Sequence, residues 1–260
     1  MPANTTSPSY FDNFQLNLCA INGLNLRFRF KAANLIIFCL AFWSTSYSQQ
    51  NKKIELQFNP TFKRQSLALD SIYYHLNQTD SVQFTVLKFY ISNISLFADS
   101  QLVFREENSF HLIDASLKGS LMLPLSVPQS AFFNTIKFNL GIDSTTNVSG
   151  ALENDLDPTK GMYWTWQSGY INFKLEGNSN QCKTRKNEFK FHLGGYLAPF
   201  EALRKITLPV QHNHSISIDF PLDLFLSKLD LSVENEVMIP GYKAMLIATK
   251  AAAEFKSDTP

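Results

Sequence analysis

The segment Ile171-Asn172-Phe173-Lys174-Leu175 alternates apolar and polar residues over five positions. Successive side chains of a β-strand point to opposite faces, so the segment predicts a strand with one face in a core and the other toward solvent. The same two-residue period recurs on both sides of it, in short runs that turn residues interrupt. These runs are residues 54–58, 82–96, 135–142, 189–193, 206–208 and 216–220. The pattern predicts an all-β fold, an antiparallel β-sandwich.

Within residues 82–96 the apolar phase slips by one residue, which is what a β-bulge produces. No strand–helix unit repeats, which argues against a parallel sheet. Residues 242–255 are rich in alanine and follow Gly241, so we expect a short C-terminal helix there, and Pro221 can begin another. Residues 143–160 have almost no apolar pattern and predict a long loop of the kind that is functional or disordered.

The N-terminal region has the pattern of an export signal. Arg27, Arg29 and Lys31 precede a charge-free apolar run at residues 32–43, and small residues follow at Ser46 and Ser48. The run is too short to span a bilayer, so we expect no stable membrane anchor. We predict a leader over residues 1–48, a domain over residues 49–256 and a frayed tail at residues 257–260. The product would be periplasmic or secreted.

Composition and motifs exclude several classes of function. The net charge is +1, and no basic stripe with interleaved aromatic residues is present, which argues against nucleic-acid binding. The sequence contains no nucleophile elbow, phosphate-binding loop or His-Glu-x-x-His motif, so we do not expect an enzyme. Cys182 alone of three cysteines follows the leader, so no internal disulfide is expected. Its polar loop predicts an exposed or half-buried thiol.

Two histidines are candidate metal ligands. His192 lies on the polar side of residues 189–193, just before Gly194 and Gly195, where backbone approaches closely. A neutral imidazole at a strand end suits copper or zinc, although the pattern taken alone is more typical of an ordinary surface histidine. His111 lies in a short strand and points either to the core or to the surface.

Two of the three tryptophans, Trp164 and Trp166, alternate within Gly161-Met162-Tyr163-Trp164-Thr165-Trp166-Gln167-Ser168-Gly169-Tyr170. In an extended segment both rings would point to one face, either as core anchors or as part of a site. Composition alone favours core packing, since sandwiches commonly bury a tryptophan.

That run resembles the MbnP-like copper-binding family, as do Phe89-Tyr90-Ile91-Ser92-Asn93-Ile94, Gly141-Ile142-Asp143-Ser144, Phe189-Lys190-Phe191-His192-Leu193-Gly194-Gly195 and Val237-Met238-Ile239-Pro240-Gly241. The resemblance covers roughly residues 52–256 and implies an exported bacterial β-sandwich. Some members bind one copper ion through histidines near a tryptophan that is oxidised to kynurenine. They are often paired with a di-haem enzyme of the cytochrome c peroxidase and MauG type, which performs the oxidation.

By this resemblance, Trp164 or Trp166 is the modified residue and His192 is a copper ligand. Relatives often carry a histidine just before the Val-Met of the C-terminal motif, where this chain has Glu236. A second donor is therefore needed, and His111 is the candidate. We expect an exported copper-binding protein that is not an enzyme. The alternative is a metal-free secreted module that binds a partner through residues 143–160.

Overall fold

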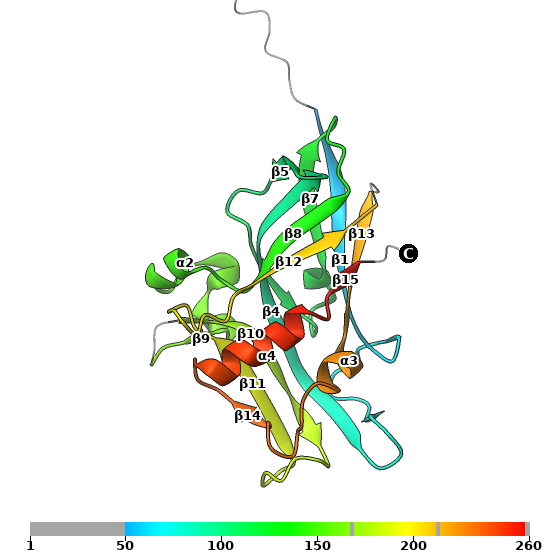
Figure 1. Ribbon diagram of the computed structural model, residues 1–260, viewed down its shortest axis with the longest axis vertical. Helices are drawn as coiled ribbons and strands as arrows, with labels where there is room; N and C mark the ends of the chain where they lie inside the picture. The colour runs from blue at the N-terminus through cyan, green and yellow to red at the C-terminus, as the bar shows by residue number, and fades with distance from the viewer. Residues whose placement is uncertain (1–49, 167–168, 212–213, 258–260) are drawn as a thin grey trace, which may run out of the picture. The chain divides into compact units, whose positions relative to one another are not determined.

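The computed structural model describes residues 50–166, 169–211 and 214–257 (Figure 1). The predicted leader, residues 1–48, lies outside these residues, and so does most of the predicted tail. The first strand begins at Asn51, shortly after the predicted cleavage site. Ser257 is not frayed, because it pairs with Ile218 at the edge of a sheet. No helix among the described residues is long and apolar enough to cross a membrane.

One sheet has five strands and is built around β1, whose neighbours are β7, β2 and β13. The side chains of β1 alternate between exposed and buried, with Ile54, Leu56 and Phe58 buried as the sequence predicts. The strands are β1 (Asn51–Phe62), β2 (Gln65–Ser66), β7 (Met122–Pro128), β13 (Ser215–Pro221) and β15 (Lys256–Ser257).

The second sheet has ten strands and is built around β4, which pairs with strands on both of its edges. Two register shifts along β4 account for the phase slip in the sequence. One faces the step from Glu176 to Gly177, and the other surrounds Asn93, whose φ is +53°. The strands are β3 (Tyr74–His75), β4 (Ser81–Ala98), β5 (Gln101–Arg105), β6 (Phe110–Asp114), β8 (Thr135–Leu140), β9 (Tyr163–Trp164), β10 (Gly169–Ser179), β11 (Glu188–Gly194), β12 (Arg204–Pro209) and β14 (Glu236–Val237).

The main core lies between the sheets and is rich in phenylalanine. Phe89, Phe173 and Phe220 are fully buried, and their rings meet at centroid distances of 5.7 to 6.3 Å. The helix α4 (Tyr242–Ala252) lies against β11 and β12 and buries its alanine-rich face (Figure 1). A shorter helix, α3 (Leu222–Leu226), begins directly after Pro221. Both predicted helices are confirmed, and so is the all-β sandwich.

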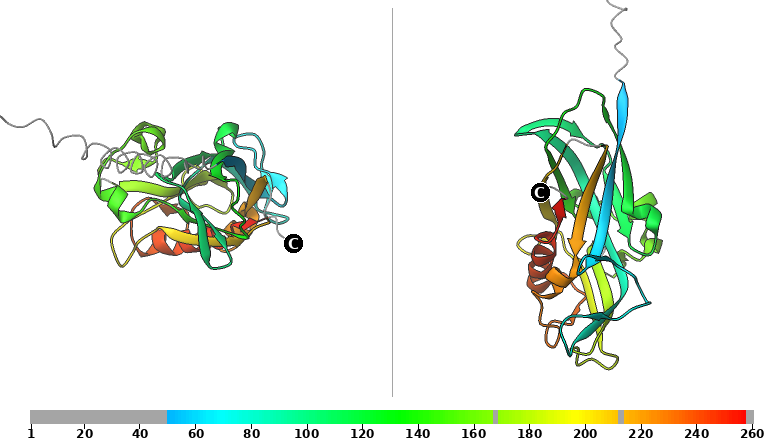
Figure 2. Two further views of the ribbon diagram at one scale, coloured as in Figure 1. Left: turned by 90° about the horizontal axis from the view of Figure 1, so that it is seen from above. Right: turned by 90° about the vertical axis from the view of Figure 1, so that its right-hand side faces the viewer.

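The strand directions are mixed, which differs from the expectation of antiparallel pairs throughout. β13 pairs parallel with β1 (Figure 2), and β14 pairs parallel with β11. A parallel pair needs a long connection between its strands. Most of the domain lies between β1 and β13 in the chain and supplies that connection. The alternation within each strand predicts its buried face and carries no information about the direction of its neighbour.

Candidate functional site

Residues 143–166 cover the outer face of the ten-stranded sheet, the face that points away from the main core. They form α2 (Ser144–Val148), two short 3-10 turns, η2 (Asn154–Leu156) and η3 (Pro158–Lys160), and strand β9. Residues 143–160 of this segment were predicted to be a long loop with almost no apolar pattern. Its few apolar side chains instead complete a second, smaller core. That core contains Tyr90, Leu112, Ile142, Leu156, Met162, Trp164, Tyr170 and Ile171.

The two tryptophans differ in burial, and this decides between the two roles that the sequence left open, core anchor and site residue. Trp164 is buried, with 6% of its surface exposed, whereas Trp166 is 63% exposed. Their ring centroids are 5.8 Å apart at an interplanar angle of 49°. The rings therefore share one side of the segment, as the spacing predicted, but Trp164 is a core anchor and Trp166 lies at the surface.

Gly194 on β11 makes room for the buried ring. A Cβ atom added at Gly194 would lie 2.5 Å from Cζ3 of Trp164 and 2.6 Å from the carbonyl oxygen of Tyr170. No side chain fits at such distances. Position 194 therefore requires glycine, because the indole ring of Trp164 lies directly against the strand.

Tyr170 and Asn147 tie the covering segment to β10. The Tyr170 hydroxyl accepts a hydrogen bond from the Leu152 amide at 3.0 Å and donates to the Leu156 carbonyl at 3.1 Å. The Tyr170 amide donates to Oδ1 of Asn147 at 2.8 Å, and Nδ2 of Asn147 donates to the Ile142 carbonyl at 3.0 Å. Burial raises the pKa of Tyr170, so the phenol stays protonated.

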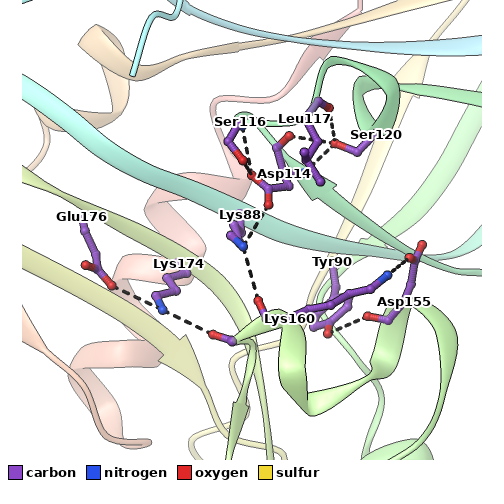
Figure 3. A network of polar contacts seen from close by, with 11 residues as sticks. Lys88, Tyr90, Asp114, Ser116, Leu117, Ser120, Asp155, Lys160, Lys174 and Glu176 are labelled. Carbon is purple, nitrogen blue, oxygen red and sulfur yellow. Dashed lines mark hydrogen bonds and ion pairs between the residues drawn. The ribbon is translucent and has the colours of Figure 1, made fainter. Parts of the chain in front are cut away.

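Two lysines hold the backbone that leads into the tryptophan pair (Figure 3). Nζ of Lys88 forms an ion pair with Asp114 at 2.9 Å and donates to the Lys160 carbonyl at 3.3 Å. Nζ of Lys174 donates to the Gly161 carbonyl, also at 3.3 Å. Both carbonyls come just before Met162, so the sheet fixes where β9 starts.

Asp155 closes the same network from the side of the covering segment. Its carboxylate accepts from Nζ of Lys160 at 2.6 Å and from the amide of Leu112 at 3.1 Å. Its carbonyl accepts from the hydroxyl of Tyr90 at 3.0 Å (Figure 3). Donors within the protein therefore satisfy the carboxylate of Asp155.

His192 lies on the same outer face and is 7% exposed, so it is not an ordinary surface histidine. Its Nε2 is 2.7 Å from Oε1 of Glu176 on the neighbouring strand. The hydrogen bond from His192, with Lys174 nearby, lowers the pKa of Glu176 to about 2 against the opposing effect of burial. His192 and Gly194 share a strand face, so the imidazole lies about 6.6 Å along the strand from the position that contacts Trp164.

His111 lies far from His192 and on the opposite face of the sheet. Its neighbours in β6, Leu112 and Asp114, face the second core and Lys88, which places His111 with Ile113 on the other side. His192 pairs with Lys174, Lys174 with Lys88, and Lys88 with Asp114 in successive strands of the sheet. Strand β6, which carries His111, is therefore three strand spacings, or about 14 Å, from β11. Nε2 of His111 instead meets Glu106 at 2.8 Å. The structure therefore does not bring His111 and His192 together at one site.

The described residues supply one imidazole beside the tryptophan pair and not a complete set of copper ligands. No group of three or more His, Cys, Asp or Glu side chains suited to a metal ion occurs among them. Cys182 cannot contribute, because it is 2% exposed and belongs to the main core, contrary to the accessible thiol that was expected. Burial raises its pKa to about 11, so the thiol is protonated and unreactive.

Glu176 is the residue that sequence reasoning missed. Glu176 follows Lys174 by two positions in β10, so both side chains lie on the outer face. His192 is the register partner of Lys174 in β11 and lies on the same face. The alternation in β10 predicts that Glu176 faces outward. Identifying its partner requires the register between β10 and β11, which the sequence does not contain.

Comparison with known proteins agrees with this architecture. No curated protein sequence matches the chain. The fold is similar to the solved structure of MbnP from Methylosinus trichosporium, with a TM-score of 0.53 and 12% sequence identity, covering 72% of this chain and 83% of that one. The family model for MbnP matches residues 51–239, nearly the whole of the described domain. The chain therefore belongs to the MbnP family.

Proposed function

We propose that the protein is an exported copper-handling protein, not an enzyme, and that His192 is its histidine ligand. Membership of the MbnP family supports the class of function. The start of β1 at Asn51 supports export, because the folded domain begins where the predicted leader ends. The observation that carries the proposal is the pair of buried His192 and half-buried Glu176, on the sheet face where Trp164 packs against Gly194.

The pairing of His192 with Glu176 suits a metal ligand. Metal-binding imidazoles usually donate their second ring N–H to a carboxylate, which fixes the tautomer and the orientation of the ring. With Nε2–H donated to Glu176, the lone pair of Nδ1 is left for the metal. Among the residues that the structure describes, Nδ1 of His192 has no hydrogen-bond partner.

A second donor would come from maturation. We propose that a partner di-haem protein of the cytochrome c peroxidase and MauG type oxidises one of the two tryptophans with two equivalents of hydrogen peroxide, which gives N-formylkynurenine and water. Hydrolysis of the formyl group then releases the former indole C2 carbon as formate and leaves kynurenine. Kynurenine has an aromatic amine and a ketone where tryptophan has an indole. Oxidation would thus add a nitrogen donor to the sheet face that carries His192.

The proposal is tested by measuring the affinity for Cu(I) of protein that was expressed together with the di-haem partner. We expect one Cu(I) per chain in the wild type and a large loss of affinity in His192→Ala. His75→Ala is the matched control, because His75 is exposed and lies on β3. His111→Ala should also leave the affinity unchanged. Equal affinity in the wild type and His192→Ala would reject His192 as the ligand.

A metal-free interaction module remains the second candidate, and exposed apolar side chains on and beside the covering segment favour it. Val148 is 72% exposed and Trp166 is 63% exposed. Apolar groups that gather on a surface commonly mark a site of protein association. This candidate predicts that protein from its native host carries no copper and two unmodified tryptophans.

A further inference from the structure

A polar cavity of about 370 Å³ lies on the outer face of the ten-stranded sheet, next to the start of α2. At this point β4 has β6 on one edge and β8 on the other, so Ser92 is the register partner of both Phe110 and Asn139. These three residues form a row across adjacent strands that is about 10 Å long. Residues that line the cavity include Ser92, Asn93, Glu106, Phe110, Asn139 and Asp143.

Asn139 is the residue that points to a ligand. Its neighbours in β8, Phe138 and Leu140, belong to the main core, so its amide lies on the outer face and lines the cavity. Asn139 is only 7% exposed, and its side chain makes no hydrogen bond with any other described residue. Buried amides in native proteins are almost always hydrogen-bonded. The amide of Asn139 can therefore both donate to and accept from a molecule that enters the cavity.

The protein holds the two acidic groups of the cavity in place. Asp143 caps α2, with Oδ1 accepting from the amide of Thr146 and Oδ2 from its hydroxyl, both at 2.9 Å. Oε2 of Glu106 is 2.8 Å from Nε2 of His111. A carboxylate oxygen has two lone pairs, so each of these oxygens can accept one more hydrogen bond from a ligand.

The lining residues define the class of ligand. None of those described is Lys, Arg or His, which disfavours an anion beside two carboxylates. Carboxylates need donors, whereas the Asn139 amide needs a donor and an acceptor, and hydroxyl groups supply both. The volume lies near the lower end of the range for small-molecule pockets, roughly 300–1,000 Å³. One water takes up about 30 Å³, so a bare cation would leave most of the cavity to solvent.

We propose that this cavity binds one neutral sugar residue. Nδ2 of Asn139 donates to one hydroxyl of the sugar, Oδ1 accepts from the next, and Asp143 accepts from a third. Phe110 is partly exposed and packs against the second core, so its ring supplies an apolar surface for the C–H face of the sugar. Binding at this site does not depend on copper.

Saturation-transfer difference NMR tests the proposal on the full chain. The protein is purified without glycerol or Tris, because both carry several hydroxyl groups and would compete. The probes are the methyl glycosides of glucose, galactose, mannose and N-acetylglucosamine. We expect saturable binding of at least one of them, and Asn139→Ala should weaken that binding several-fold. The amide that Asn139→Ala removes has no partner among the described residues, so the variant should keep the Tm of the wild type.

Asn178→Ala is the matched control. Asn178 lies in β10 of the same sheet, makes no side-chain hydrogen bond with the described residues and does not line the cavity, so the variant should bind like the wild type. Phe110→Leu keeps an apolar side chain but removes the ring, and should also weaken binding. The proposal is overturned if none of the four glycosides binds, or if Asn139→Ala binds as the wild type does. Calorimetry that detects binding of Ca²⁺ but of no glycoside would overturn it in favour of a cation site.

Discussion

Replacing Gly194 by alanine should disrupt the packing of Trp164 on β11. The added methyl carbon would lie 2.5 Å from Cζ3 and 2.9 Å from Cη2 of Trp164, and 2.6 Å from the carbonyl oxygen of Tyr170. The carbonyl is part of β10 and cannot rotate away. The indole is held by the second core on one side and touches Trp166 on another. The strand or the ring must therefore shift.

The magnitude follows from the cost of an extra methyl group in a filled core. Overpacking of this kind destabilises a protein by about 1–3 kcal/mol. For a domain of this size, 1 kcal/mol corresponds to about 2–4 °C in Tm. A cost near 2 kcal/mol therefore predicts that Gly194→Ala lowers Tm by about 4–8 °C.

Thermal unfolding followed by tryptophan fluorescence measures this change. Near-ultraviolet circular dichroism should change as well, because the two indoles lie in contact. Gly119→Ala is the matched control: nothing lies within 4 Å of its added Cβ, and its φ is not positive. Its Tm should stay close to that of the wild type. If Gly194→Ala has the same Tm as Gly119→Ala and keeps the near-ultraviolet circular dichroism spectrum of the wild type, the packing described for Trp164 is wrong.

Three further predictions concern single side chains. Because the pKa of Glu176 falls from 4.5 to about 2 on folding, the contacts of its carboxylate, above all the hydrogen bond with His192, should contribute at most about 3 kcal/mol to the free energy of unfolding above pH 4.5. This contribution should vanish as the pH falls through about 2. Urea unfolding of the wild type and Glu176→Gln against pH checks this, and a stability difference that persists at the acid end would contradict it. Tyr170→Phe should lower the free energy of unfolding by about 1–3 kcal/mol, because the Leu152 amide loses its hydrogen-bond acceptor, and should speed proteolysis within residues 143–160. Tyr73→Phe, at an exposed site, is the control and should match the wild type in both measurements. Below its pKa of about 11, Cys182 should resist thiol reagents until the protein unfolds. Peptide mapping distinguishes its labelling from that of Cys19 and Cys39. Rapid labelling of Cys182 in the native protein would contradict this prediction.

The alternation of side chains predicts a strand well where one of its faces is covered by the core. In β1 the buried positions match the sequence pattern, and in β4 the change of apolar phase marks the two register shifts. The pattern does not predict which strands become neighbours. The parallel pairing of β1 with β13 depends on contacts between residues more than 150 positions apart in the chain.

The candidate site was harder to predict because the outer face of the sheet is covered as well. His192 lies on the polar side of its strand, as expected, but residues 143–166 pack over that side and the histidine is buried. In β6 both Leu112 and Ile113 are apolar, since they face different cores, so the orientation of His111 could not be deduced. Trp164 and Trp166 have the same local pattern, and their different exposure depends on the position of Gly194 in a separate strand.

The structure connects the tryptophan pair to the rest of the sheet through a few polar contacts. Lys88 and Lys174 hold the backbone before β9, and the His192–Glu176 pair lies beside Lys174 on the same face. This explains how one short segment can present an exposed ring and a buried ring next to an imidazole. Maturation and copper binding would both take place on this face.

The central proposal, that the protein handles copper beside an oxidised tryptophan, is tested most directly by metal analysis and mass spectrometry of protein purified from its native host. We predict one copper per chain, an intact mass that reveals kynurenine, and a peptide map that places kynurenine at Trp164 or Trp166. Protein that contains no copper and carries both tryptophans unmodified would contradict the proposal and favour the metal-free interaction module.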